Sequence, residues 1–292
     1  MSMVWSAMSE NENEGASERM KNDPSQALAE SLLTAPLLCR KVEGILTFDR
    51  VRLATNTWRG AGSTLNFQQK LGHLYEDCLQ QLLEAAPKIE LLASHLQIFD
   101  NDRRTLGELD YLLHDLDSGT HIHLELAVKF YLAVEGENGW LYPGPDPHDD
   151  WTRKYQRLAT HQLTLCQRDE ARALLNLRFQ IESVQAQHLI YGVIFRPLDA
   201  PDAPLPDTIH PQCRTGSWLH CKDWSQHFSD LERVALIPKA LWPVNFTRAD
   251  HPLLQQISVK ALQAQARERA VLFQTPRDLR PCFLVPDTWP SI

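Results

Sequence analysis

Carboxylates and a lysine occur at alternating positions of two successive predicted strands near the middle of the chain. The first segment, residues 106–116, reads LGELDYLLHDL, and the second, residues 121–135, reads HIHLELAVKFYLAVE. Side chains alternate between the two faces of a strand, so Glu125 shares a face with Lys129, and Asp110 can share that face from the first strand. Hard cations such as Mg²⁺ prefer carboxylate oxygens, and a lysine can stabilise anionic oxygens. The two strands therefore carry residues suited to metal-assisted chemistry.

The turn between these strands decides which residues face each other. If residues 118–119 form a two-residue turn, Asp110 and Glu125 become diagonal neighbours whose backbones lie roughly 7–8 Å apart, close enough to bind one cation. The same register places Glu108 opposite Lys129, so an ordinary ion pair on a solvated face is the alternative interpretation. Glu125, however, is flanked by apolar residues, and a carboxylate in a buried strand needs a partner.

The order of these residues resembles the PD-(D/E)XK nuclease superfamily, which has the restriction-endonuclease-like fold. Gly72 and Glu76 lie in a predicted helix, the GELD motif follows at residues 107–110, and a strand then carries Leu-Glu at 124–125 with Lys129 nearby. The four-residue GELD motif is moderately specific for this class. These motifs cover only the segment from the helix to the lysine.

The chain as a whole more closely resembles the bacterial domain-of-unknown-function family 1853, which has been grouped with that superfamily. This likeness extends over most of the chain and includes the Trp-Pro pair at residues 289–290. A member of this family is expected to have an α/β, restriction-endonuclease-like fold.

The resemblance implies metal-dependent hydrolysis of phosphodiester bonds in nucleic acid, with DNA as the expected substrate. Asp110 and Glu125 would bind Mg²⁺ or Mn²⁺, Lys129 would lie near the attacking water, and Glu76 would be a supporting carboxylate. A divalent ion lowers the pKa of bound water, while a lysine stabilises the developing negative charge. The superfamily has its lysine two residues after the glutamate, but here that position is Ala127.

The displaced lysine leaves two alternatives open. Lys129 begins on the order of 13 Å along the strand from Glu125, instead of roughly 7 Å for a lysine two residues away. Lys154 or Gln162, in the predicted helix that follows, could supply the donor instead. Otherwise the protein is a catalytically inactive relative that binds nucleic acid or a protein partner.

His121, His123 and Glu125 alternate on one face, which is the pattern of a transition-metal site. The two histidines lie near the predicted turn, where a surface position is the simpler interpretation. We therefore expect no metal bound by these imidazoles.

The order of the predicted elements indicates an α/β protein. A helix over residues 64–84 precedes three strands, and a Gly-, Pro- and Asp-rich loop leads into a second helix over 151–177. Residues 184–198 and 216–224 resemble strands, and 253–273 a last helix. We expect a restriction-endonuclease-like mixed central sheet flanked by helices, with a C-terminal extension.

Three segments divide the chain. Residues 1–24 are polar and acidic, which is typical of a disordered tail. Residues 25–200 hold the nuclease-like core, and residues 201–292 form an extension packed on that core. The proline-rich stretch at 201–211 is either a linker or a long loop, and we favour a single domain with an extension.

Composition limits the possible partners. The formal net charge is −8, so the bulk field does not favour a polyanion, and binding of nucleic acid requires a local basic site. Two clusters combine basic and aromatic residues: Arg50, Arg52, Trp58 and Arg59, and then Trp151, Arg153, Lys154, Tyr155 and Arg157. No glycine-rich phosphate loop is present, which argues against a nucleotide cofactor. The absence of a signal sequence and of long apolar runs predicts a cytoplasmic protein that does not enter the membrane.

Overall fold

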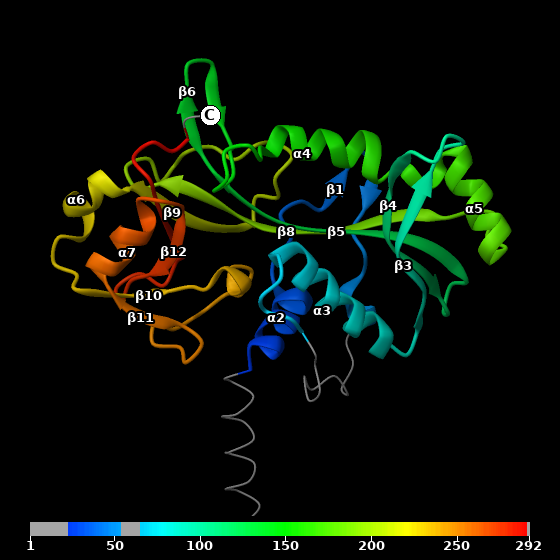
Figure 1. Ribbon diagram of the computed structural model, residues 1–292, viewed down its shortest axis with the longest axis horizontal. Helices are drawn as coiled ribbons and strands as arrows, with labels where there is room; N and C mark the ends of the chain where they lie inside the picture. The colour runs from blue at the N-terminus through cyan, green and yellow to red at the C-terminus, as the bar shows by residue number, and fades with distance from the viewer. Residues whose placement is uncertain (1–22, 54–64, 291–292) are drawn as a thin grey trace, which may run out of the picture.

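A computed structural model describes residues 23–53 and 65–290 of the chain. Its centre is a nine-stranded mixed sheet that runs the length of the molecule (Figure 1). In spatial order its strands are β11 (Gln255–Ser258), β10 (Arg233–Leu236), β12 (Val271–Gln274), β13 (Cys282–Val285), β9 (Arg214–His220), β8 (Gln185–Pro197), β5 (Thr120–Leu132), β4 (Thr105–Asp115) and β3 (Ile89–Phe99). The mixed α/β architecture with a large sheet is thereby confirmed.

The four central strands β5, β8, β9 and β13 are parallel, and both ends of the sheet are antiparallel. Two small hairpins lie outside the sheet. They are β1 (Lys41–Val42) with β2 (Ile45–Leu46), and β6 (Val134–Gly136) with β7 (Gly139–Leu141).

Helices cover both faces of the sheet. The α-helices are α2 (Pro24–Thr34), α3 (Leu71–Ala85), α4 (Trp151–Arg157), α5 (Asp169–Phe179), α6 (Trp224–Phe228) and α7 (Val259–Ala266). Short 3₁₀ turns are η1 (Arg50–Leu53), η3 (Leu165–Gln167), η4 (Cys221–Asp223) and η5 (Lys239–Leu241), and η2 (Leu158–Gln162) is a π-turn. Figure 1 shows α2 and α3 on one face and α4 on the other. None of the helices within 23–53 and 65–290 is long and apolar enough to cross a lipid bilayer.

Strand β5 has apolar cover on both sides because its alternate residues pack against different layers. Leu124 and Leu126 belong to the core on the side of α2 and α3. Ala127 belongs to a second core with Trp151 and Leu158 of the α4 layer. The odd-numbered residues of β5, Glu125 among them, therefore face the α4 layer.

The predicted two-residue turn between β4 and β5 is wrong. Residues 116–119 form a four-residue loop, closed by a 2.7 Å hydrogen bond from the Gly119 amide to the Asp115 carbonyl. Gly119 has φ +70°, a conformation that glycine adopts without strain. The register shifts by two residues relative to the prediction, with Tyr111 opposite Leu124. Because the shift is even, Asp110 and Glu125 keep their shared face.

The predicted helix over 151–177 is interrupted. A π-turn follows α4, and the chain at Arg168 is extended before α5 begins. The hydroxyl groups of Thr160 and Thr164 donate to carbonyls four residues upstream, at 2.9 and 3.1 Å. Such contacts bend helices, which gives a physical reason for the interruption.

The two other predicted helices also differ from the structure. The helix expected over 64–84 begins at Leu71, and residues 54–64 lie outside the described part. The segment 253–273 is a strand, a helix and a second strand, because residues near both of its ends pair with β10 in the sheet. Ser258 separates the first strand from α7 and accepts a hydrogen bond from the Ala261 amide, as a helix N-cap does.

The segment expected as a C-terminal extension contributes five strands, β9 to β13, to the same sheet as β3, β4, β5 and β8. Residues 1–22 of the predicted tail lie outside the described residues. Asp23 caps α2 by accepting the Ser25 amide at 2.8 Å, so the described chain becomes helical at Pro24.

Candidate active site

Asp110 lies where strands β4 and β5 part. Their ladder runs from Asp115 opposite Thr120 to Tyr111 opposite Leu124, one residue short of Asp110. Beyond that point the Oδ2 atom of Asp110 accepts the Leu126 backbone amide at 2.8 Å. Burial, opposed by this hydrogen bond, raises the pKa of Asp110 from its ordinary value to about 7.

Glu125 is the most enclosed carboxylate of this group, with 1% of its surface exposed. Its Oε1 atom accepts a hydrogen bond from the Gln162 amide, whereas its Oε2 atom has no hydrogen-bond partner among the described residues. Burial raises the pKa of Glu125 well above its ordinary value, and the nearby charge of Asp110 raises it further. An unpartnered buried acceptor is costly, so this oxygen needs an explanation.

Lys154 supplies a positive charge from the helix layer. Its Nζ atom donates to Gln162 Oε1 at 2.7 Å. Burial lowers the pKa of Lys154, while the carboxylates of Glu125 and Asp110 act in the opposite direction. Gln162 therefore joins the lysine to Glu125 through two consecutive hydrogen bonds.

Local sequence explains why α4 presents Lys154 to the sheet. Asp150 caps the helix by accepting the Arg153 amide at 3.1 Å. Trp151 is buried and donates from its indole nitrogen to Thr208 at 2.8 Å. Residues three and four apart share one face of a helix, so Lys154 lies on the face that Trp151 anchors.

The structure places Lys129 in a different contact from the expected one. Its Nζ atom lies 2.7 Å from Asp149 Oδ2. Glu108 instead contacts His95 Nδ1 at 3.0 Å. The alternative ion pair between Glu108 and Lys129 is therefore wrong, because the β4–β5 ladder ends at Tyr111 before it reaches this pair.

Glu76 comes from α3, on the opposite face of the sheet from α4. Its backbone carbonyl accepts the Tyr111 hydroxyl at 2.7 Å, and its carboxylate contacts His73 Nδ1 at 3.0 Å. Its negative charge contributes to the raised pKa of both Asp110 and Glu125. Within residues 23–53 and 65–290, no three Cys, His, Asp or Glu side chains are grouped closely enough to hold one metal ion.

Two buried histidines flank Glu125. His123 is fully buried, although a surface position was expected, and its Nε2 atom lies 3.9 Å from Glu125 Oε2. His188 on β8 is directly opposite Glu125 and was not identified from the sequence. Neither ring has a hydrogen-bond partner among the described residues, and burial lowers the pKa of each to about 4. In the sequence, His188 is a lone histidine in an apolar strand. Its position opposite Glu125 depends on the parallel pairing of β8 with β5.

His121 takes no part in this group. It stacks on His114 with ring centroids 4.7 Å apart. The expectation that these imidazoles hold no transition metal therefore stays a prediction.

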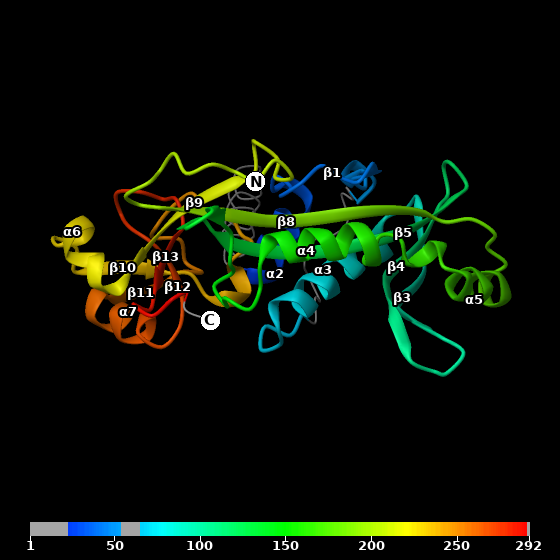
Figure 2. The same ribbon diagram turned by 90° about the horizontal axis from the view of Figure 1, so that it is seen from above.

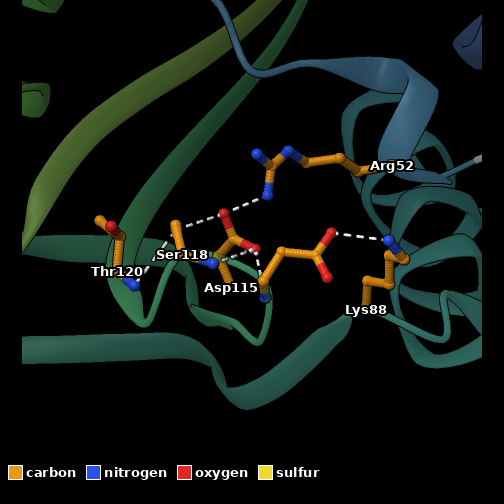
Figure 3. A network of polar contacts seen from close by, with 6 residues as sticks. Arg52, Lys88, Asp115, Ser118 and Thr120 are labelled. Atoms are coloured by element: carbon orange, nitrogen blue, oxygen red, sulfur yellow. Dashed lines mark hydrogen bonds and ion pairs between the residues drawn. The ribbon is translucent and has the colours of Figure 1, made fainter.

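A second polar network surrounds Asp115 at the β4–β5 loop (Figure 3). Asp115 pairs with Arg52 and accepts the Ser118 hydroxyl at 2.6 Å, while Lys88 lies 2.8 Å from Asp117. In Figure 3 these side chains connect η1, the turn between α3 and β3, and the β4–β5 loop. The network therefore fixes the loop at the base of the hairpin.

The first predicted basic cluster includes Arg52 of this network. Arg50 donates to the carbonyls of Leu32 and Ala35. Trp58 and Arg59 lie outside the described residues. The two described arginines of this cluster thus serve contacts within the molecule.

The fold and the site define a class: a mixed α/β protein in which a buried carboxylate, a partly buried carboxylate and a lysine lie where strands β4 and β5 part. A family model described as "Domain of unknown function (DUF1853)" matches residues 19–277. The chain belongs to this family, as its resemblance to family 1853 predicted. No curated protein matches the chain. No solved structure matches it either.

Proposed function

We propose that this protein is a Mg²⁺- or Mn²⁺-dependent nuclease of the PD-(D/E)XK superfamily that hydrolyses phosphodiester bonds in DNA. The observation that carries the proposal is the common position of Asp110, Glu125 and Lys154 at the point where β4 and β5 part. The element order α3, β3, β4, β5, α4 and β8 supports a restriction-endonuclease-like core. This order combines an antiparallel meander with a helical crossover to a parallel strand.

The available oxygens suit a hard cation. Mg²⁺ binds through one or two carboxylates, keeps several waters and uses substrate phosphates as further ligands. Asp110 and the unpartnered Oε2 atom of Glu125 would hold the ion. When bound, the ion would lower the pKa of a water ligand and stabilise charge on the phosphate.

The remaining residues position these groups and add charge. The Leu126 amide fixes the orientation of the Asp110 carboxylate. Lys154, held by Gln162, would stabilise negative charge on the phosphate or on the attacking oxygen. Lys154 is favoured over Lys129 for this role because Lys129 already pairs with Asp149.

The second candidate function is that of a catalytically inactive relative that binds nucleic acid or a protein. Ala127 at the usual lysine position favours this alternative. The hydrogen bond from Gln162 also occupies one of the two oxygens of Glu125. A buried carboxylate group of this kind can persist as a structural remnant after catalysis is lost.

A cleavage assay separates the two functions. Linear, nicked, gapped and single-stranded DNA would be incubated with wild type and the Asp110→Asn variant, in Mg²⁺, in Mn²⁺ and in EDTA. The nuclease proposal expects metal-dependent cleavage that falls about 100-fold or more in the variant. If wild type cleaves none of these substrates in either metal, the proposal fails and the inactive relative replaces it.

A further inference from the structure

The α4–α5 segment, residues 151–180, has a charge opposite to that of the rest of the chain. It contains six basic residues and two acidic ones, whereas the remaining residues contain 23 basic and 35 acidic ones. A local excess of positive charge on an acidic protein is not explained by the overall composition. It concentrates the attraction for anions on one layer of the molecule.

Five arginines of this segment are exposed to solvent: Arg153, Arg157, Arg168, Arg172 and Arg178. None of the five forms an ion pair with a carboxylate within the described ranges 23–53 and 65–290. Other exposed arginines do pair, for example Arg248 with Asp250 at 3.0 Å. The guanidinium groups of the α4–α5 segment therefore keep their charge available to a partner.

The spacing of these arginines suits a polyanion. Arg153 and Arg157 are one helical turn apart, as are Arg168 and Arg172 at the start of α5. Four residues of an α-helix rise about 6 Å, which is close to the rise of two nucleotides of one DNA strand along the duplex axis, about 3.4 Å each. The acidic pair Asp169 and Glu170 interrupts the segment only in the first turn of α5, where negative charge stabilises a helix.

The α4–α5 segment lies next to the candidate active site. Figures 1 and 2 both show α4 lying along β5 and β8, with α5 beyond it at the β3 and β4 end of the sheet. The charge of Arg157 acts on Glu125 and on Lys154, which places it within electrostatic range of both. A phosphate backbone bound along these helices would pass close to the carboxylates.

We infer that the exposed face of α4–α5 is the docking surface for the sugar-phosphate backbone of duplex DNA. This inference rests on the proposed function for the identity of the polyanion. The aromatic residues of the segment, Trp151, Tyr155 and Phe179, are buried or partly buried, so this face offers cations without platforms for base stacking. Single strands are held by stacking on exposed aromatics, whereas duplexes are positioned through their phosphates.

Fluorescence anisotropy in EDTA tests the surface without cleavage. Full-length protein would be titrated into a labelled DNA duplex of about 20 base pairs, its single strand and the matching RNA duplex, at several salt concentrations. Two double variants, Arg153→Gln with Arg157→Gln and Arg168→Gln with Arg172→Gln, should each weaken duplex binding about tenfold. Each should also reduce the slope of log K against log salt by about 1.8, the value for two lost phosphate contacts.

The matched control is Arg267→Gln with Arg269→Gln, two exposed arginines just after α7 at the far end of the sheet. The control should bind the duplex like wild type, and all variants should melt within a few degrees of it. Equal losses in the control would overturn the inference, and so would unchanged binding by the α4–α5 variants. Tighter binding of the single strand or of the RNA duplex would overturn the assignment to duplex DNA.

These outcomes are independent of catalysis. Arginine-dependent duplex binding without any metal-dependent cleavage would leave the docking surface standing and remove the nuclease. Metal-dependent cleavage by a protein whose duplex binding does not depend on these arginines would support the nuclease and overturn the docking surface.

Discussion

The Nζ atom of Lys154 lies 2.7 Å from the Oε1 atom of Gln162. The amide group of the same glutamine donates to Glu125. Among the residues that the structure describes, Lys154 forms no direct ion pair with Glu125, so the glutamine separates the two charges. This arrangement leaves the lysine charge available for a phosphate and leaves the second carboxylate oxygen available for a cation.

The two lysines near the site should differ in their effect on turnover. We expect Lys154→Met to reduce cleavage about 100-fold while metal affinity is largely retained, because a positioned charge acts on the transition state. Lys129→Met removes a half-exposed pair with Asp149, so it should cost at most about 1 kcal/mol in stability and leave turnover nearly unchanged. Single-turnover cleavage and urea unfolding measure the two effects. A larger loss of turnover in Lys129→Met would return the catalytic assignment to Lys129.

Gln162 should also stabilise the fold. Gln162→Leu leaves the amide contacts of both Glu125 and Lys154 unmade, and the expected loss is about 2 kcal/mol in the free energy of unfolding at neutral pH. Gln156 provides the control because its side chain is exposed on α4, the helix that directly precedes the π-turn with Gln162, and Gln156→Leu should change stability by less than about 0.5 kcal/mol. Equal stabilities for the two variants in urea unfolding would show that the hydrogen-bond chain has no energetic role.

Asp110 should make stability depend on pH. Its folded-state pKa of about 7 lies above its ordinary value of 3.8. The stability gained from proton binding is present in full below about pH 4 and is lost as pH rises through about 7. Asp110→Asn does not titrate, so its stability relative to wild type should increase by on the order of 2–4 kcal/mol between about pH 4 and 8.

Asp115, on the same strand β4, is a control whose pKa shifts in the opposite direction. Hydrogen bonds from Ser118 and Asp117, together with the charge of Arg52, outweigh the desolvation of this carboxylate and lower its pKa. The stability contributed by the ionised Asp115 carboxylate is present above its ordinary pKa and is lost as pH falls through its folded-state pKa. Asp115→Asn should therefore be less stable than wild type at neutral pH, and the difference should shrink in acid. If the difference in stability between Asp110→Asn and wild type does not change with pH, the pKa of Asp110 is not raised in the folded protein.

Metal affinity should rise with pH for the same reason. A cation competes with the proton on Asp110, whose pKa is about 7. Between about pH 6 and 8 the ionised fraction of such a group increases about tenfold, and the affinity for Mn²⁺ should increase by at least this factor, because the raised pKa of Glu125 acts in the same direction. Titration of Mn²⁺ monitored by electron paramagnetic resonance at the two pH values measures this change. Equal affinities would place the ion on groups other than Asp110.

The residues with strict periodicity were predictable from the sequence. Alternation placed Asp110 and Glu125 on one face, and that result survived a wrong turn because the register moved by an even number of residues. The turn itself was not predictable, since Leu116 and Asp117 continue the pattern of the strand.

Features that depend on tertiary contacts could not be predicted from the sequence. His188 lies opposite Glu125 through parallel pairing with a distant strand. The π-turn that ends at Gln162 interrupts a pattern that otherwise reads as one helix. The short C-terminal strands are four residues each, too short to be distinguished from a helix by periodicity alone.

Calorimetric titration of Mg²⁺ and Mn²⁺ into wild type, Asp110→Asn and Glu125→Gln at about pH 8 tests the central claim most directly. We expect one cation site in wild type and a loss of affinity of tenfold or more in each variant, with all three proteins folded by circular dichroism. The two variants remove only the charge and keep the shape of the side chain. Absence of cation binding to wild type, or equal binding by all three proteins, would contradict the assignment of Asp110 and Glu125 as metal ligands.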